Sequence, residues 1–136
     1  MVQIDIAYQG QLRCLATHTP SGTTLSTDAP KDNMGKGELF SPTDLLATAL
    51  GTCMLTIMGI VAQRHGLSLE GSTITVVKEM VSQPVRRIGC LAVTINVPTK
   101  LSPDDQRRLE NCVVTCPVHK SLHPDIDIPI TFNWAK

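Results

Sequence analysis

The chain has 136 residues, enough for a single domain, residues 1–136, that holds together without a structural metal or disulfides. Its 12 Lys and Arg residues balance its 12 Asp and Glu residues, which argues against a nucleic-acid-binding face and against a polybasic membrane anchor. Hydrophobic residues make up 42% and charged residues 18%, so we expect an ordered globular protein.

Strand patterns dominate the first part of the chain. Val2, Ile4, Ile6 and Tyr8 alternate with more polar residues, which predicts a strand with one apolar side. Turn residues separate two further expected strands, at 11–18 and 23–27, and a polar loop with two glycines runs from 28 to 40.

A long helix is expected next. Ser41 is a suitable N-cap, Pro42 suits the first helical position, and Asp44 lies in the first turn, where a negative charge is favourable. The helix should end near His65, because Gly66 follows it. Its residues are apolar nearly all round, which predicts a buried helix. A partner subunit would be the simplest cover for its remaining sides.

The second half continues the mixture of strands and helices. Strands are expected at 69–81 and 86–97, joined as a hairpin, and the second of them alternates strictly. Ser102-Pro103 begins another helix, and the last strand is expected at 126–134. The order β-β-β-α-β-β-α-β predicts an α+β fold with a mostly antiparallel sheet and a central buried helix.

The expected location is cytoplasmic. The first residues contain an early acidic Asp5 and lack the apolar core of a signal peptide. The uncharged stretch from Leu45 to Ala62 contains threonines and glycines, and we expect it to be a core helix rather than a membrane span. In a reducing compartment the five cysteines should be free thiols, with catalytic, metal-binding or packing roles.

Two cysteines stand out. Cys53 lies within the apolar helix, where a free cysteine commonly packs as a small hydrophobe; to react, it would need a nearby cation and access to solvent. Cys116 precedes Pro117 and can be the N-cap of a short helix over 117–122. Unpaired backbone N–H groups at that end would lower its pKa, so local reasoning predicts that Cys116 is the better-activated thiol.

The other candidate thiols and imidazoles carry weaker signals. We expect Cys14 and Cys90 to be packing residues in strands. An alternative is a zinc cluster, although its spacing matches no common zinc site and two prolines interrupt it. The four side chains available for it are Cys112, Cys116, His119 and His123. Our main interpretation requires no metal and no cofactor.

Two segments resemble the OsmC/Ohr superfamily of thiol-dependent peroxidases, in particular its divergent OsmC-like branch. They are SPTDLLATALGTC, from Ser41 to Cys53, and CPVHKSL, from Cys116 to Leu122. The resemblance extends over essentially the whole chain and implies an α+β fold. It also implies an intertwined homodimer with two active sites at the subunit interface, which would supply the missing cover for the apolar helix.

The resemblance implies a reaction as well. Cys53 matches the peroxidatic cysteine, which attacks the O–O bond of a small organic hydroperoxide and becomes a sulfenic acid. Cys116 matches the cysteine that condenses with it to form a disulfide, which a dithiol reductant then reduces. The alternative is a non-enzymatic OsmC-fold protein that binds a small hydrophobic ligand or senses redox state.

The activating ion pair of the peroxidase branches is not recognisable in this sequence. Those branches have a Glu after the proline of the first helix, where this chain has Thr43, and an Arg just before the stretch matching 24–27, where it has none. Other residues would therefore have to activate Cys53. The candidate cations are Arg13, Arg86 and Arg87, and the candidate carboxylates are Asp44 and Glu79.

Overall fold

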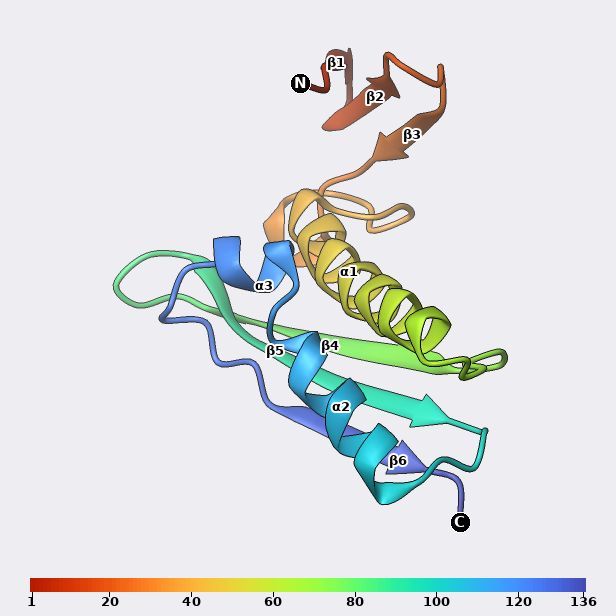
Figure 1. Ribbon diagram of the computed structural model, residues 1–136. Coiled ribbons are helices and arrows are strands. Elements are labelled where there is room, and N and C mark those ends of the chain that lie inside the picture. The colour runs from red at the N-terminus through yellow and green to blue at the C-terminus, as the bar shows by residue number, and fades with distance from the viewer. The chain divides into compact units, whose positions relative to one another are not determined.

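The computed structural model describes residues 1–136, which form two compact units, Met1–Leu46 and Ala47–Lys136 (Figure 1). The two units are described in turn. The expectation that all 136 residues act as one domain stays a prediction.

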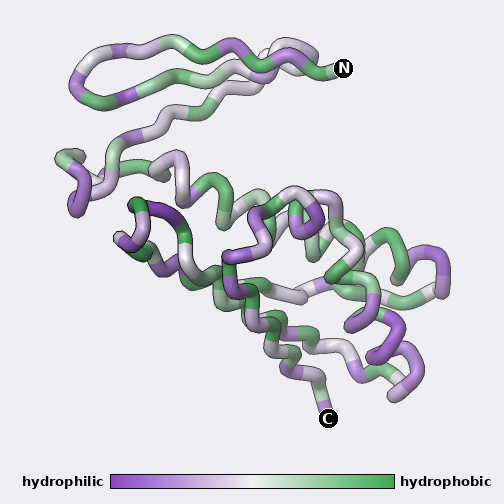
Figure 2. The backbone as a smooth tube through the Cα atoms, turned by 90° about the vertical axis from the view of Figure 1, so that its left-hand side faces the viewer, coloured by the Kyte–Doolittle hydropathy of each residue, from purple (hydrophilic) through white to green (hydrophobic).

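The first unit contains a three-stranded antiparallel sheet in the order β1-β2-β3. Its strands are β1 (Ile4–Gly10), β2 (Arg13–His18) and β3 (Thr24–Thr27), close to the predicted ranges. The hydropathy alternation that predicted β1 is visible along this hairpin in Figure 2. The apolar side chains of β1 are all exposed, so this unit by itself leaves them without cover.

A reciprocal pair of hydrogen bonds begins the long helix α1 (Pro42–Arg64). The Asp44 backbone N–H donates to Ser41 Oγ at 3.1 Å, and the Ser41 backbone N–H donates to Asp44 Oδ2 at 2.9 Å. This is a capping box, in which each side chain satisfies a backbone donor of the other residue. The predicted cap at Ser41 is confirmed.

The second unit contains the sheet β4-β5-β6. Strand β4 (Thr73–Val81) pairs antiparallel with β5 (Arg87–Val97), whereas β6 (Ile130–Trp134) pairs parallel with β5. Both β4 and β6 begin later than predicted. A glycine with a φ of 81° turns the chain at Gly71, and Pro129 has no N–H to offer a neighbouring strand. The segment before β6 still pairs once with β5, between Cys90 and Asp127.

Three helices lie on the same face of this second sheet: α1, α2 (Pro103–Val113) and the short α3 (Pro117–Ser121) (Figure 1). The α+β class and the predicted order of elements are confirmed, and the short helix predicted over 117–122 is present as α3. The core between helices and sheet is made of fully buried apolar residues, among them Leu50, Met54, Met58, Leu91, Val93, Ile95, Leu109 and Val113.

Helix α1 contributes to that core along one face. A Cβ atom added at Gly51 would lie 3.1 Å from Val76 Cγ2, so the absence of a side chain permits the helix to approach β4 closely. Ile60, in contrast, keeps 41% of its surface exposed. By length and hydropathy α1 could also cross a membrane, but core helices of soluble proteins have the same composition, and its buried face forms part of a packed core.

Candidate functional site

The structure brings Cys53 and Cys116 together within the second unit. Cys53 lies on α1 and Cys116 immediately precedes α3, and the two thiols lie close enough for Cys53 to raise the pKa of Cys116. Cys53 is partly exposed, whereas Cys116 has no exposed surface. Of the two thiols in contact, only Cys53 is accessible to a solute.

The local sequence positions Cys116. Its backbone is extended, with φ −61° and ψ 138°, and Pro117 begins the helix directly after it. The His119 backbone N–H donates to Cys116 Sγ at 3.2 Å, so the thiol satisfies one of the donors that a helix start leaves without a partner. The predicted N-cap role of Cys116 is therefore confirmed.

The predicted activation of Cys116 is wrong. Burial raises the pKa of Cys116, the His119 N–H opposes this, and the contact with Cys53 raises the pKa further. The net result is a pKa above the usual value of a cysteine. The sequence prediction considered only the backbone N–H donors at the start of the helix. It could not anticipate that the tertiary structure buries the thiol completely. Burial disfavours the charged thiolate and therefore raises the pKa.

Arg13, one candidate cation, is paired within the first unit. Its Nη2 atom lies 2.6 Å from Glu38 Oε2 and 3.5 Å from Asp28 Oδ2. Asp28 is buried, and burial alone would raise its pKa. The backbone N–H groups of Glu38 and Ala29, together with the Arg13 charge, outweigh burial and lower that pKa.

Sequence analysis did not single out Asp28. The available signal was its place at the end of a strand, before a glycine-containing loop whose backbone N–H groups need acceptors. Among the predicted carboxylates, Asp44 accepts the Ser41 N–H at the start of α1.

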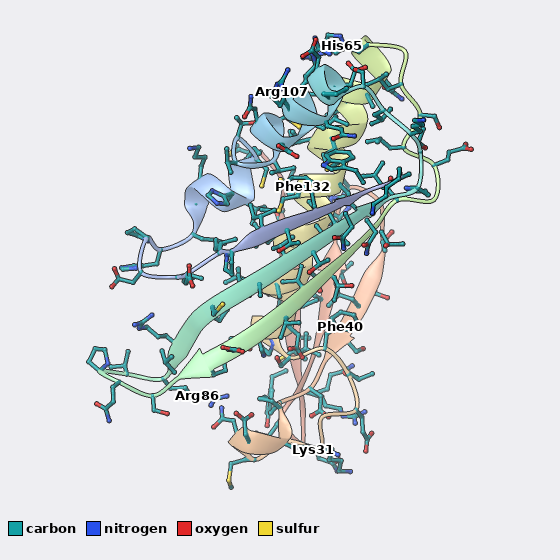
Figure 3. All side chains as sticks on the ribbon, turned by 90° about the horizontal axis from the view of Figure 1, so that it is seen from below. Lys31, Phe40, His65, Arg86, Arg107 and Phe132 are labelled. Carbon is teal, nitrogen blue, oxygen red and sulfur yellow. The ribbon has the colours of Figure 1, made fainter.

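The remaining candidates lie along the β4–β5 hairpin. Arg86 is exposed in the connecting turn, at the end of the sheet far from His65 and Arg107 (Figure 3). Arg87 begins β5, and its Nη1 donates to the Ile88 carbonyl at 3.4 Å. Glu79 is the cross-strand partner of Cys90. A role for any of these groups in activating Cys53 stays a prediction.

Cys90 has an acidic environment. Burial raises its pKa, and the nearby carboxylates of Asp127 and Glu79 raise it further. Its neighbours therefore favour the neutral thiol, which agrees with the packing role predicted for it.

The alternative zinc cluster is contradicted, since the structure gathers no three His, Cys, Asp or Glu side chains into a group that could hold a metal ion. The Cys112 thiol donates to its own helix, to the Leu109 carbonyl at 3.1 Å. His123 Nδ1 accepts the Asp125 backbone N–H at 3.1 Å.

Solved structures of other proteins have the same fold as this chain. A crystal structure from Psychrobacter arcticus 273-4, provisionally described as an osmotic stress induced and detoxification response protein, is 45% identical. It has a TM-score of 0.92, with 97% of this chain and 96% of that chain covered.

Two more distant structures share the fold. The organic hydroperoxide resistance protein OsmC of Legionella pneumophila is 18% identical with a TM-score of 0.79, and 98% of this chain and 96% of that one are covered. The organic hydroperoxide resistance protein OhrB of Bacillus subtilis is 16% identical with a TM-score of 0.69, and 97% of each chain is covered.

No curated protein gives a match to this sequence. A family model described as OsmC-like protein matches residues 35–131. This range includes Cys53, Cys116, all elements from α1 to α3, and the start of β6. The family match extends over most of the chain. The structure that is 45% identical is aligned with 97% of this chain. On this evidence the chain belongs to the OsmC-like protein family, within the OsmC/Ohr superfamily.

Proposed function

We propose that this chain is a thiol-dependent peroxidase that reduces organic hydroperoxides through Cys53 and Cys116. The observation that carries the proposal is the contact between a partly exposed thiol and a fully buried one. The names of the Legionella pneumophila and Bacillus subtilis proteins, both organic hydroperoxide resistance proteins, support the choice of substrate class.

The reaction begins at Cys53, because its thiol is the accessible member of the pair. The Cys53 thiolate attacks the terminal peroxide oxygen, an S–O bond forms, and the O–O bond breaks. The alkoxide leaves, takes up a proton and becomes an alcohol, and Cys53 becomes a sulfenic acid. Two electrons have passed from the sulfur to the peroxide.

Cys116 completes the cycle. Its sulfur attacks the sulfenic sulfur, the S–S bond forms as the S–O bond breaks, and the hydroxyl group takes the thiol proton of Cys116 and departs as water. A small dithiol then attacks the disulfide, is itself oxidised, and returns both cysteines to thiols. The reductant's first attack is expected at Cys53, since Cys116 has no exposed surface.

A homodimer of single-domain subunits in the cytoplasm is part of the proposal. Ile4, Ile6 and Tyr8 on β1 keep 58%, 68% and 67% of their surfaces exposed, and Ile60 on α1 is also exposed. Large exposed apolar surfaces of this kind mark interaction sites. A second copy of the chain would bury them and would complete the cover that α1 lacks.

The groups that activate Cys53 are also a proposal. Arg13 shares its charge with two carboxylates, so its effect on other groups is reduced. Alanine variants of Arg13, Arg86 and Arg87, each compared by the rate of Cys53 alkylation, would identify the cation. Variants Asp44→Asn and Glu79→Gln would test the carboxylates in the same assay.

The proposal is tested by exposing fully reduced protein briefly to cumene hydroperoxide, with hydrogen peroxide in a parallel sample. Non-reducing peptide mapping should find a nearly stoichiometric Cys53–Cys116 disulfide, formed faster with the organic peroxide. Cys90 is the internal control, because its acidic surroundings should keep it a thiol. If Cys53 and Cys116 stay reduced, the peroxidase is excluded and a ligand-binding or redox-sensing role replaces it.

A further inference from the structure

The polar loop 28–40 of the first unit is closed by hydrogen bonds at its two ends. The Asp28 backbone N–H donates to the Phe40 carbonyl at 3.1 Å, which brings the ends of the loop together. The buried Asp28 carboxylate accepts the Glu38 backbone N–H at 3.2 Å. These bonds fix the shape of the loop, which Lys31 marks in Figure 3.

The backbone of Met34 has an unfavourable conformation within this loop. Met34 ends the 3₁₀ helix η1 (Lys31–Asn33) with φ 74° and ψ −4°, in the left-handed region that favours glycine. The next residue, Gly35, donates its N–H to the Pro30 carbonyl at 3.0 Å. A Cβ atom at Gly35 would lie only 1.8 Å from the Ala29 carbonyl oxygen, so the chain turns tightly here.

The side chain of Met34 is directed to solvent. It keeps 88% of its surface exposed, whereas Met54 and Met58 on α1 have no exposed surface, and Met80 packs against the core. Packing therefore does not explain a methionine at position 34, and its backbone conformation favours another residue. Residues held in such conformations are frequent at functional positions.

A thioether that is accessible to solutes can reduce a hydroperoxide without an activating group. The sulfur attacks the terminal peroxide oxygen, an S–O bond forms, and the O–O bond breaks. The hydroxyl proton on the new S–O group passes to the departing alkoxide, which becomes an alcohol, and methionine becomes its sulfoxide. Two electrons pass from the sulfur to the peroxide, and neither a base nor a cation is needed.

We propose that Met34 is a sulfoxidation site for organic hydroperoxides. This site goes beyond the proposed thiol reaction, because it requires neither Cys53 nor Cys116 and shares with it only the class of oxidant. Oxidation replaces an apolar thioether by a polar sulfoxide on the exposed loop, and a methionine sulfoxide reductase restores the thioether.

The test exposes the folded chain to a large excess of cumene hydroperoxide without reductant, followed by trypsin digestion and mass spectrometry. Trypsin releases residues 32–36, DNMGK, in which Met34 is the single methionine, whereas Met54 and Met58 lie in the peptide 37–64. The peptide 32–36 should gain oxygen about tenfold or more faster, because oxidation of a fully buried side chain requires the core to open. In urea the two peptides should be oxidised at similar rates.

Variants separate this site from the thiols and from a structural role. The rate of Met34 oxidation should be the same in Cys53→Ser and at about pH 6 and pH 8, because a thioether has no proton to lose whereas a thiol reacts as its thiolate. Met34→Leu should leave the formation of the Cys53–Cys116 disulfide unchanged. Met34→Gly relieves the left-handed conformation and should not lower the thermal unfolding midpoint.

The outcomes distinguish this proposal from the proposed function. Equal oxidation of the peptides 32–36 and 37–64 in the folded chain would overturn the Met34 site, and so would a slower oxidation of Met34 in Cys53→Ser. A lower unfolding midpoint for Met34→Gly would show that the methionine serves stability, which also overturns the proposal. If Met34 is oxidised as expected but no Cys53–Cys116 disulfide forms, the Met34 site stands and the peroxidase proposal falls.

Discussion

The thiols of Cys53 and Cys116 are neighbours within the second unit, although the two residues are 116 − 53 = 63 positions apart in the chain. The contact is asymmetric. Cys53 is partly exposed on α1, while Cys116 is fully buried and receives the His119 N–H. In the proposed reaction, this difference in exposure is the reason that Cys53 reacts first and Cys116 acts as its internal partner.

Cys53→Ser should abolish the turnover of cumene hydroperoxide in the presence of a dithiol. A serine hydroxyl is a weak nucleophile without an adjacent base, so the rate should fall to that of the reductant alone. The measurement is the initial rate of peroxide loss. Cys90→Ser is the matched control and should keep the wild-type rate. A Cys53→Ser variant with wild-type turnover would contradict the assignment of the peroxidatic residue.

Asp28→Asn should lower the thermal unfolding midpoint at neutral pH, because a buried carboxylate that accepts backbone N–H groups and faces Arg13 is replaced by a neutral amide. The folded pKa of Asp28 lies below its unfolded value of about 3.9. Its stabilising contribution is therefore present above that value and is lost as the pH falls through the folded pKa.

The difference between the wild-type chain and Asp28→Asn should consequently shrink on acidification. Unfolding midpoints measured by circular dichroism at neutral pH and at about pH 3 provide the comparison. Asp5→Asn, in exposed β1, is the control and should change the midpoint little at either pH. A constant difference at both pH values would show that the charge of Asp28 is not what stabilises the loop.

Glu110→Ala should destabilise the second unit by about 1 kcal/mol, since Trp134 Nε1 donates to Glu110 Oε1 at 2.9 Å. This hydrogen bond links α2 to β6, and Trp134 also stacks on Phe132 with ring centroids 5.4 Å apart. Trp134 is the single tryptophan of the chain, so urea unfolding followed by its fluorescence reports directly on this region. Glu110→Gln keeps an acceptor and should recover most of the loss.

Leu109→Ala should cost about 2–5 kcal/mol of unfolding free energy, because the side chain is fully buried in the core and its removal leaves a cavity. Val114→Ala, at the end of the same helix, concerns a side chain with 40% of its surface exposed and should cost about 0.5 kcal/mol or less. Equal losses in urea unfolding would indicate that α2 does not pack on the sheet as described.

Ile6→Lys should shift the protein from dimer to monomer. In the proposed homodimer this exposed side chain becomes buried, and a lysine there would place an unpaired charge in an apolar contact. Size-exclusion chromatography with light scattering measures the mass of the particle. Gln9→Lys, an exposed change on the same strand, should leave the mass unchanged. A wild-type chain that elutes as a monomer would contradict the proposed dimer directly.

Local features of the fold were predictable from the sequence. The capping box of Ser41 and Asp44 involves residues three positions apart, and the buried alternation of β5 is visible in its own residues. The N-cap role of Cys116 follows from Pro117 alone. Each of these depends on backbone geometry within a few residues, which neighbouring side chains determine.

The tertiary structure decided what depends on distant parts of the chain. The parallel pairing of β6 with β5 and the pairing of Arg13 with Asp28 and Glu38 could not be derived from spacing. Nor could spacing show that no group of metal-ligating side chains forms. The pKa of Cys116 moves against the local expectation for the same reason. Desolvation depends on every atom that surrounds the thiol, and those atoms come from segments far away in the sequence.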